Sequence, residues 1–208
     1  KLAKYVGVWK INILNYTIYK YNILFRLIFL IFISYIMLML WDKIFSLKNT
    51  NHINEYSFQK LIWYLLITRM ISLSCININM EISQDIKSGR IIYVLNKPYN
   101  YILYNFIGSL GKLCLPFSIN FIASVFIGLL YVGNLDGIAF YMLPLIIIPI
   151  ILGICIDWFI CLNLSLTAFW IEENSSIFWI YQRLISTIGG LMIPIDMFPQ
   201  WLGKICSK

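Results

Sequence analysis

Few residues in the sequence have the types and spacing that catalysis requires. The single histidine, His52, stands in a polar stretch, whereas a zinc peptidase needs two histidines on one helical face and a serine nucleophile needs a strained turn. The five cysteines form no C-x-x-C pair, and most lie in apolar runs, where free thiols behave as small hydrophobic side chains. We therefore expect no metal site, no disulfide and no catalytic residue in this chain.

The spacing of two carboxylates is compatible with binding of a metal ion. Glu81 and Asp85 stand one helical turn apart and could hold a divalent cation, as an enzyme acting on lipid headgroups would require. Lys87 and Arg90 follow them, which is more typical of a solvated helix face. A membrane enzyme acting on lipid headgroups is therefore kept as an alternative function.

The stretch GSLGK, from Gly108 to Lys112, is the nearest approach to a nucleotide-binding loop. It lacks both the spacing of G-x-x-x-x-G-K and the Ser or Thr that would bind magnesium. Its small residues instead favour a close contact between helices. If ATP drives this protein, a partner must bind the ATP and its Mg²⁺.

The composition indicates that lipid surrounds most of the chain. Of 208 residues, 61% are hydrophobic and only 12% are charged, whereas soluble domains carry about 25% charged residues. This excludes a soluble enzyme, a disordered regulator and a nucleic-acid-binding module. The net charge of +7 suits contact with anionic lipid headgroups.

The apolar runs predict an all-α, polytopic membrane protein with one transmembrane domain over residues 1–208. A helix needs about 20 apolar residues to cross the hydrocarbon, and five segments qualify. The predicted spans are residues 22–42, 58–80, 101–132, 138–171 and 175–195. Residues 1–20 are predicted to form an amphipathic helix on the inner surface, residues 81–100 a cytoplasmic connection, and residues 196–208 a re-entrant or interfacial outer segment.

Lysine and arginine set the predicted orientation. They collect in residues 1–26 and in the connection after the second span, which places the N-terminus and that connection in the cytoplasm. Five spans then leave Lys208 outside, so we expect a sixth span beyond it.

The cytoplasmic connection has a pattern of its own. Glu81, Asp85 and Ser88 share one side of a predicted helix and Ile82 and Ile86 share another, and Gly89 is predicted to end it. Beyond Arg90, the stretch from Ile91 to Leu95 is predicted to be extended, and Pro98 to end it.

Three charged residues fall inside predicted spans. An Arg at a helix centre costs about 2.5 to 3.5 kcal/mol, so Arg69, Asp157 and Arg183 must reach an interface or face protein or water. They could line a subunit interface or a path for a substrate. An ion-coupled carrier that uses Asp157 and Arg183 is a further alternative.

The order of these features resembles that of bacterial ABC transporter permeases of the ABC-2 type. One motif is E-I-x-x-D-I-x-S-G-x-I-x-x-x-L-x-x-P, from Glu81 to Pro98, and a second is G-G-x-x-x-P-x-x-x-x-P-x-W-L, from Gly189 to Leu202. Between them, residues 169–172 (FWIE) are similar to the end of the family's fourth span. The resemblance covers nearly the whole chain.

The resemblance implies an export permease in the bacterial cytoplasmic membrane, without an ATPase motif of its own. It implies three kinds of partner: a separate ABC ATPase that binds ATP and Mg²⁺, a second permease subunit, identical or related, and membrane lipids. The ATPase-coupling segment would comprise Glu81, Ile82, Asp85, Ile86, Ser88, Gly89 and Arg90, and the outer gate hairpin Gly189, Gly190, Pro194, Pro199 and Trp201.

Overall fold

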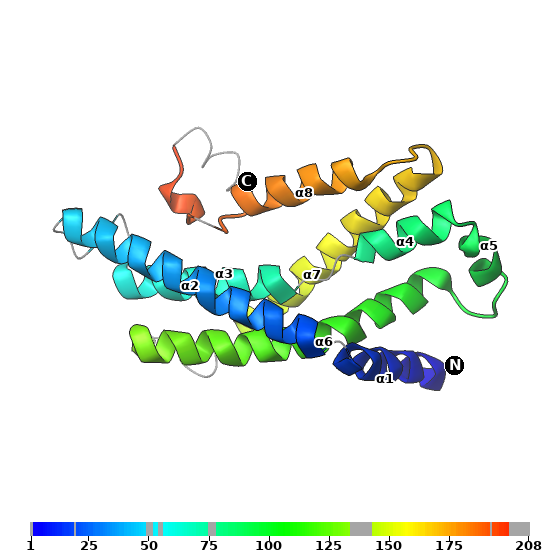
Figure 1. Ribbon diagram of the computed structural model, residues 1–208, viewed down its shortest axis with the longest axis horizontal. Coiled ribbons are helices and arrows are strands. Elements are labelled where there is room, and N and C mark those ends of the chain that lie inside the picture. The colour runs from blue at the N-terminus through cyan, green and yellow to red at the C-terminus, as the bar shows by residue number, and fades with distance from the viewer. Residues whose placement is uncertain are drawn as a thin grey trace. The chain divides into compact units, whose positions relative to one another are not determined.

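The computed structural model describes residues 2–18, 20–48, 52–53, 56–74, 78–133, 143–191 and 193–199. Within these ranges the regular structure is helical apart from one short antiparallel hairpin, which confirms the predicted helical fold (Figure 1). In chain order the elements are α1 (Leu2–Ile18), α2 (Lys20–Lys48), β1 (His52–Ile53), β2 (Tyr56–Ser57), α3 (Phe58–Ser74), α4 (Ile78–Lys87), α5 (Arg90–Leu95), α6 (Tyr101–Tyr131), α7 (Leu143–Leu166), the 3₁₀ turn η2 (Thr167–Phe169), α8 (Ser175–Ile188) and the 3₁₀ turn η3 (Ile195–Met197).

Three of the described helical stretches are long and apolar enough to cross a membrane. They are Tyr21–Lys48, Tyr101–Tyr131 and Ile147–Phe169, and they coincide with the first, third and fourth predicted spans. The remaining two predicted spans contain shorter helices, α3 with 17 residues and α8 with 14. At about 1.5 Å per residue, these helices measure about 26 Å and 21 Å, less than the hydrocarbon thickness of about 30 Å. The five-span count stays a prediction.

Two described helices end before the predicted spans that contain them. The second span was expected to be helical to residue 80, but α3 ends at Ser74, and Ile78–Met80 form the first turn of α4. The fifth span was expected to reach residue 195, but α8 ends at Ile188, where Gly189 and Gly190 form a turn. Gly190 has a φ of 74°, a backbone conformation that α-helices do not contain, so the apolar character of residues 191–195 cannot extend the helix.

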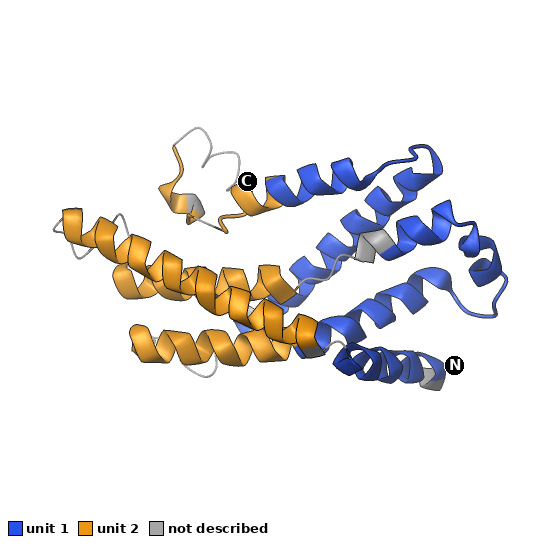
Figure 2. Cartoon of the chain, in the orientation of Figure 1, with its two compact units in different colours: residues 1–18, 75–115, 138–183 blue, residues 19–74, 116–137, 184–208 orange. Residues whose placement is uncertain are grey.

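The chain divides into two compact units, each with a core of its own (Figure 2). Unit 1 comprises residues 1–18, 75–115 and 138–183, and unit 2 comprises residues 19–74, 116–137 and 184–208. The core of unit 2 contains buried side chains from α2, α3 and the end of α6, with Trp41, Trp63 and Ile127 among them. In this unit Gly128 provides room for the Trp63 indole, because a Cβ at that position would overlap the ring.

The core of unit 1 is a smaller group that we call the Trp158 cluster. Its buried members come from α4, α5 and α7, and they are Ile82, Ile86, Ile91, Trp158 and Leu162. Phe106 of α6 packs against this cluster with its ring edge-on to Trp158, at 5.0 Å between centroids. The consecutive helices α4, α5 and α6 are therefore joined to the distant helix α7 by one apolar cluster.

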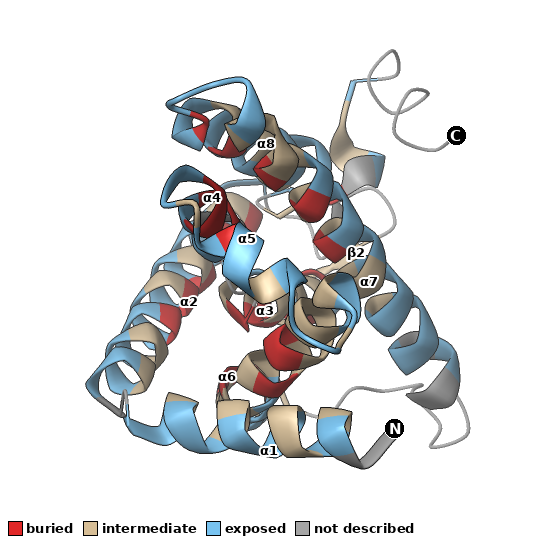
Figure 3. Ribbon diagram, turned by 90° about the vertical axis from the view of Figure 1, so that its right-hand side faces the viewer, coloured by how far each residue is buried: buried red, intermediate tan, exposed pale blue. Residues whose placement is uncertain are grey.

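Large apolar side chains are exposed along the long helices. In α2, α6 and α7, residues such as Phe32, Ile122 and Ile151 are more than half exposed, and Figure 3 shows many exposed positions along α2 and α7. A water-soluble protein rarely exposes contiguous apolar surface of this extent, so these positions fit contact with lipid.

Candidate functional site

The helix α4 contains the first sequence motif, and glycine ends it. Gly89 has a φ of 70°, and its N–H donates to the Ile86 carbonyl oxygen at 3.0 Å, while the Ser88 N–H donates to the Gln84 carbonyl oxygen at 2.9 Å. Glycine enters the left-handed region without steric cost, which is why it is the commonest residue to close a helix there. The predicted helix end at Gly89 is thus confirmed.

The stretch after Gly89 corrects the sequence prediction. The extended conformation expected for residues 91–95 is wrong, because Arg90–Leu95 forms the short helix α5. Its β-branched residues have only a weak preference for strands, and tertiary packing overrides it. Here the helix buries Ile91 in the Trp158 cluster and leaves Ile92 and Tyr93 exposed.

The apolar side of α4 is anchored inside unit 1. Ile82 and Ile86 are 1% and 9% exposed and pack against α7 through Trp158 and Leu162. Burial of an isoleucine side chain contributes about 1.5 to 3 kcal/mol. The helix α4 therefore packs against α7 through the apolar side that the sequence predicts.

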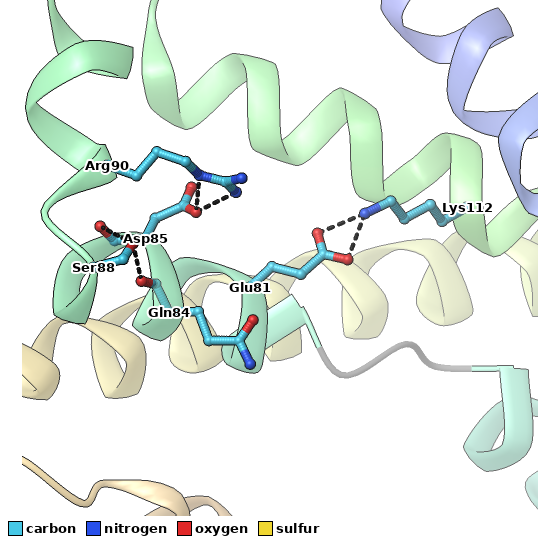
Figure 4. Close-up of polar contacts among 6 residues, drawn as sticks. All are labelled: Glu81, Gln84, Asp85, Ser88, Arg90 and Lys112. Carbon is cyan, nitrogen blue, oxygen red and sulfur yellow. Dashed lines mark hydrogen bonds and ion pairs between the residues drawn. The ribbon is translucent and has the colours of Figure 1, made fainter.

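Both carboxylates of α4 bind cations of the same chain (Figure 4). The Lys112 Nζ on α6 donates to Glu81 Oε1 at 2.7 Å, and the Arg90 Nε donates to Asp85 Oδ1 at 2.7 Å. The Asp85 side chain is 11% exposed, so Arg90 balances a nearly buried charge. Each carboxylate of α4 is therefore paired with a cation of the same chain.

The predicted grouping of Glu81, Asp85 and Ser88 on one side of the helix does not produce a common site. The Ser88 hydroxyl turns back and donates to the Gln84 carbonyl oxygen at 2.6 Å, which helps to close the helix. Glu81 reaches α6, whereas Asp85 reaches α5. Among the described residues, no group of three or more His, Cys, Asp and Glu side chains is arranged to hold a metal ion.

A buried polar contact ties α4 to the connection before α8. The Asn174 Nδ2 donates to Ser83 Oγ at 3.0 Å, and both residues are buried, at 2% and 5% exposure. Sequence reasoning missed both residues, since nothing in their immediate neighbourhood signals a contact across 91 positions. It also missed the ion pair between Lys112 and Glu81, although the opposite charges of the two residues could have indicated it.

The same connection carries a carboxylate with a lowered pKa. Hydrogen bonds from the Ser175 hydroxyl and backbone N–H hold the pKa of Glu173 below its ordinary value, and the positive charge of Lys87 on α4 lowers it further. Because Glu173 is fully exposed, this attraction between the connection and α4 is weak.

The glycines of the GSLGK stretch serve as a contact between helices, as the sequence favoured. A Cβ on Gly111 would lie 2.8 Å from the Trp9 carbonyl oxygen, and one on Gly108 would lie 3.3 Å from the Asn12 side-chain nitrogen. The helix α1 therefore crosses α6 at these two glycines.

The charged residues inside the predicted spans have separate environments. The Tyr181 hydroxyl on α8 donates to Asp157 Oδ1 on α7 at 2.7 Å, which joins two helices of unit 1. Arg183 lies 5.3 Å from the Trp179 ring centroid, a cation–π contact within α8. Within the described part of the chain, the Arg69 Nε and one of its terminal nitrogens are buried without a hydrogen-bond acceptor.

The second motif forms a compact turn in unit 2. The Tyr64 hydroxyl donates to the Gly190 carbonyl oxygen at 2.9 Å, and the Tyr56 hydroxyl donates to Asp196 Oδ2 at 2.8 Å. The Pro194 side chain is fully buried, whereas Pro199 is exposed. Trp201, also predicted to belong to the outer gate, and Leu202 lie outside the described residues. The segment from Gly189 to Pro199 is thus attached to α3 and to the β hairpin.

Taken together, α4 is a short helix bonded to three of its neighbours in unit 1. It contacts α7 by its isoleucines, α6 by the Glu81–Lys112 pair, and the start of α8 by the Ser83–Asn174 bond. A displacement of α4 must therefore move these neighbours or break the contacts. The exposed positions of the helix, with Gln84 and Lys87 among them, face away from this support.

Comparison with known proteins identifies a family. A family model described as ABC-2 family transporter protein matches residues 29–207, which is most of the chain. No curated protein and no solved structure gave a match. On the strength of the family match, which includes both sequence motifs and every helix from α3 to α8, the chain belongs to the ABC-2 family of transporter proteins.

Proposed function

We propose that this chain is the membrane-spanning permease subunit of an ABC exporter, and that a separate ATPase subunit hydrolyses the ATP that drives it. The family match supports a transporter membrane domain. The coupling step is supported by the contacts that attach α4 to α6, to α7 and to the residue before α8. On this proposal α4 and Gly89 lie on the cytoplasmic side and form the segment on which the ATPase acts.

The mechanism follows from rigid attachment. When the ATPase closes on ATP, it displaces α4, and the buried contacts of Ile82, Ile86 and Ser83 carry the displacement to the attached helices. Asp85 and Arg90 hold the turn between α4 and α5 in one conformation, so that the displacement is not lost in the loop. ATP and Mg²⁺ would be bound by the ATPase alone.

The remaining parts of the proposal complete a transport path. A second permease subunit, identical or related, would form the other half of the path, in a bacterial cytoplasmic membrane with the N-terminus in the cytoplasm. The helix α1 would lie along the inner lipid surface. The segment from Gly189 to Pro199 would close the path on the outer side, supported by its bonds to Tyr64 and Tyr56.

The two alternatives receive no support from specific contacts. An enzyme acting on lipid headgroups would need the carboxylates of Glu81 and Asp85 for a metal ion, but Lys112 and Arg90 bind them. An ion-coupled carrier would use the Asp157 carboxylate, but one oxygen of that carboxylate already accepts a hydrogen bond from the Tyr181 hydroxyl.

The test uses two substitutions of Gly89 that differ in the backbone they allow. The permease and its ATPase subunit are reconstituted together, and ATP turnover is compared with that of the ATPase alone, so no substrate need be known. Proline cannot adopt a positive φ, so Gly89→Pro should abolish the permease-dependent change in turnover. Asparagine tolerates the left-handed region, so Gly89→Asn should keep most of it.

Two outcomes would count against the proposal. One is a wild-type permease that leaves ATP turnover unchanged, and the other is a Gly89→Pro variant that behaves as the wild type. Hydrogen exchange of α4 in the Gly89→Asn variant provides the control for local folding.

A further inference from the structure

Three polar side chains in the core of unit 2 have buried atoms without a hydrogen-bond partner. Ser34 of α2 and Ser124 of α6 are 4% and 3% exposed, and their hydroxyls have no partner in the described part of the chain. The same holds for the Nε and one terminal nitrogen of Arg69 in α3. Buried polar groups in folded proteins are almost always hydrogen-bonded, so three such side chains in one core require an explanation.

Each of the three stands on the side of its helix that faces this core. Residues three or four positions apart share a helical face, and the three polar side chains share their faces with buried apolar members of the core. These neighbours are Leu30 and Leu38 for Ser34, Leu65 and Leu66 for Arg69, and Ile127 for Ser124.

Contacts between α3 and α6 set the level of Arg69. The Trp63 ring packs against Gly128, where a Cβ would overlap it. Nearer the other end of α3, the Asn120 Nδ2 donates to Ser74 Oγ at 3.1 Å. Arg69 stands about midway between Trp63 and Ser74 in the sequence, so it lies opposite the middle of residues 120–128. That middle is the position of the buried serine of α6.

Contacts between α2 and α3 bring the buried serine of α2 to the same level. The rings of Phe45 and Phe58 lie 5.5 Å apart between centroids. Farther along both helices, the Arg26 guanidinium donates to the Leu73 carbonyl oxygen at 3.1 Å. Between these two contacts Arg69 falls within one turn of the serine, and its side chain leans toward the start of α3, which is the direction of that serine. We call Ser34, Arg69 and Ser124 the Arg69 site.

The Arg69 site lies near the middle of the membrane. From Leu113 to Tyr131, α6 contains 19 residues without a charge, about 28 Å of helix, which matches a hydrocarbon layer about 30 Å thick. Ser124 stands about 3 Å from the centre of this stretch and about 10 Å from its nearer end. An arginine side chain does not span that distance, so Arg69 cannot reach the headgroups and must face protein or water.

The three unit 2 helices at this level offer Arg69 no carboxylate. Residues 20–41, 58–74 and 116–131 contain neither Asp nor Glu. A guanidinium donates hydrogen bonds and accepts none, and a water molecule would leave its charge uncompensated. Arg69 is only half-buried, so a group from outside the core can approach it. An oxyanion such as a phosphate or a carboxylate supplies both the acceptor atoms and the negative charge.

We propose that the Arg69 site binds an oxyanion of the exported substrate while that substrate crosses the membrane. The Arg69 guanidinium pairs with a phosphate or carboxylate group, and the hydroxyls of Ser34 and Ser124 donate to the same group. Headgroups of resident lipids stand about 15 Å from the midplane, so only a molecule in transit brings its anion to this level. This inference rests on the proposed function and adds to it the chemical class of the substrate.

Dodecyl phosphate, titrated into the permease in neutral maltoside micelles, is the probe. An anion that binds the folded protein raises the thermal midpoint, and the dependence on concentration gives the half-saturating concentration. We expect Arg69→Gln to raise that concentration at least about 10-fold, and the double variant Ser34→Ala with Ser124→Ala to raise it about 5-fold or more. Arg183→Gln makes the same charge change at an exposed position of α8 and should stay within about 3-fold of wild type.

The protein without added anion separates an unpaired arginine from a structural one. Arg69→Met removes an uncompensated cation and should raise the thermal midpoint by about 2 to 4 °C. Arg26 is also half-buried, but its guanidinium binds the Leu73 carbonyl oxygen, so Arg26→Met should lower the midpoint by a similar amount. A lower midpoint in Arg69→Met would mean that Arg69 already has a partner in the chain, and the inference would fail.

Two further probes distinguish the sources of the oxyanion. If inorganic phosphate competes with dodecyl phosphate, the site takes water-soluble anions. If phosphatidic acid in nanodiscs raises the midpoint of wild type but not of Arg69→Gln, and phosphatidylcholine raises neither, the site takes the headgroup of a transported lipid.

The remaining outcomes separate this inference from the proposed function. If dodecyl phosphate stabilises Arg69→Gln as well as wild type, or dodecyltrimethylammonium acts as dodecyl phosphate does, the site binds no anion. The inference then fails alone, because the proposed function is judged by ATP turnover. If the anion binds as expected but the permease leaves ATP turnover unchanged, the proposed function fails and the anion site remains.

Discussion

The ion pair between Glu81 and Lys112 allows the coupling argument to be tested by charge reversal. Two unit charges about 4 Å apart attract by about 1 kcal/mol in water and by about 4 kcal/mol at an effective dielectric constant of 20. The side chains of Glu81 and Lys112 are 55% and 25% exposed, so solvent screening favours a value of about 1 kcal/mol. In Glu81→Lys this attraction becomes a repulsion of similar size, a change of about 2 kcal/mol. That corresponds to about a 30-fold shift in the equilibrium between seated and released α4.

The double variant Glu81→Lys with Lys112→Glu should restore the contact. The recovery will be incomplete, because Glu81 stands in the first turn of α4, where a negative charge also gains up to about 0.5 kcal/mol from the helix dipole. With Lys in that turn the gain becomes a cost of similar size, about 1 kcal/mol in all, so we expect the double variant to come within about 5-fold of wild type.

Hydrogen exchange of the α4 backbone amides, followed by mass spectrometry, measures this equilibrium. We expect protection to fall about 30-fold in Glu81→Lys and to return in the double variant, with permease-dependent ATP turnover following the same order. Glu172→Lys makes the same charge change at an exposed position outside α4 and should leave protection unchanged. If the double variant exchanges as fast as Glu81→Lys, then Lys112 is not the partner that seats α4, and the reasoning is wrong.

Three further predictions concern the support around α4. Gly111→Ala should lower the thermal midpoint, by the equivalent of about 1 to 3 kcal/mol, because its Cβ meets the α1 backbone, whereas Gly7→Ala has open space and should raise the midpoint slightly. Asn174→Ala should cost about 1 to 3 kcal/mol of unfolding free energy by leaving the Ser83 hydroxyl buried without a partner, and adding Ser83→Ala should recover part of it, as chemical denaturation would show. The pKa of Glu173 is lowered in the folded chain, so this carboxylate should add slightly to stability above pH about 4.5 and lose that effect as the pH falls below it. The thermal midpoints of wild type and Glu173→Gln, compared from about pH 7 to about pH 3, should therefore differ less and less as the pH falls.

The parts of the fold that depend on local chemistry could be predicted from the sequence. The end of α4 at Gly89 follows from the conformational freedom of one residue, and the contact at Gly108 and Gly111 follows from the absence of side chains. The long helices follow from uninterrupted apolar runs. In each case the signal lies within a few neighbouring positions.

The parts that depend on distant contacts could not be predicted. The sequence identified Gly111 as a packing position, but not α1 as the helix that packs there. The extended prediction for residues 91–95 failed because the burial of Ile91 is decided by Trp158 and Leu162, more than sixty positions away. For the candidate site, the residues of α4 were identified, whereas the partners Lys112 and Asn174 were not.

The composition of the Trp158 cluster also bears on how the protein is made. Ile82, Ile86 and Ile91 leave the ribosome before Trp158, and about 70 residues separate the two groups. At a synthesis rate of about 5 to 20 residues per second, α4 and α5 would wait roughly 4 to 14 seconds for the helix that covers them. During that interval the three isoleucine side chains are open to chaperones or to the membrane surface. A slower ribosome should therefore increase degradation of the nascent chain, and α7 supplied as a separate peptide during synthesis should reduce it.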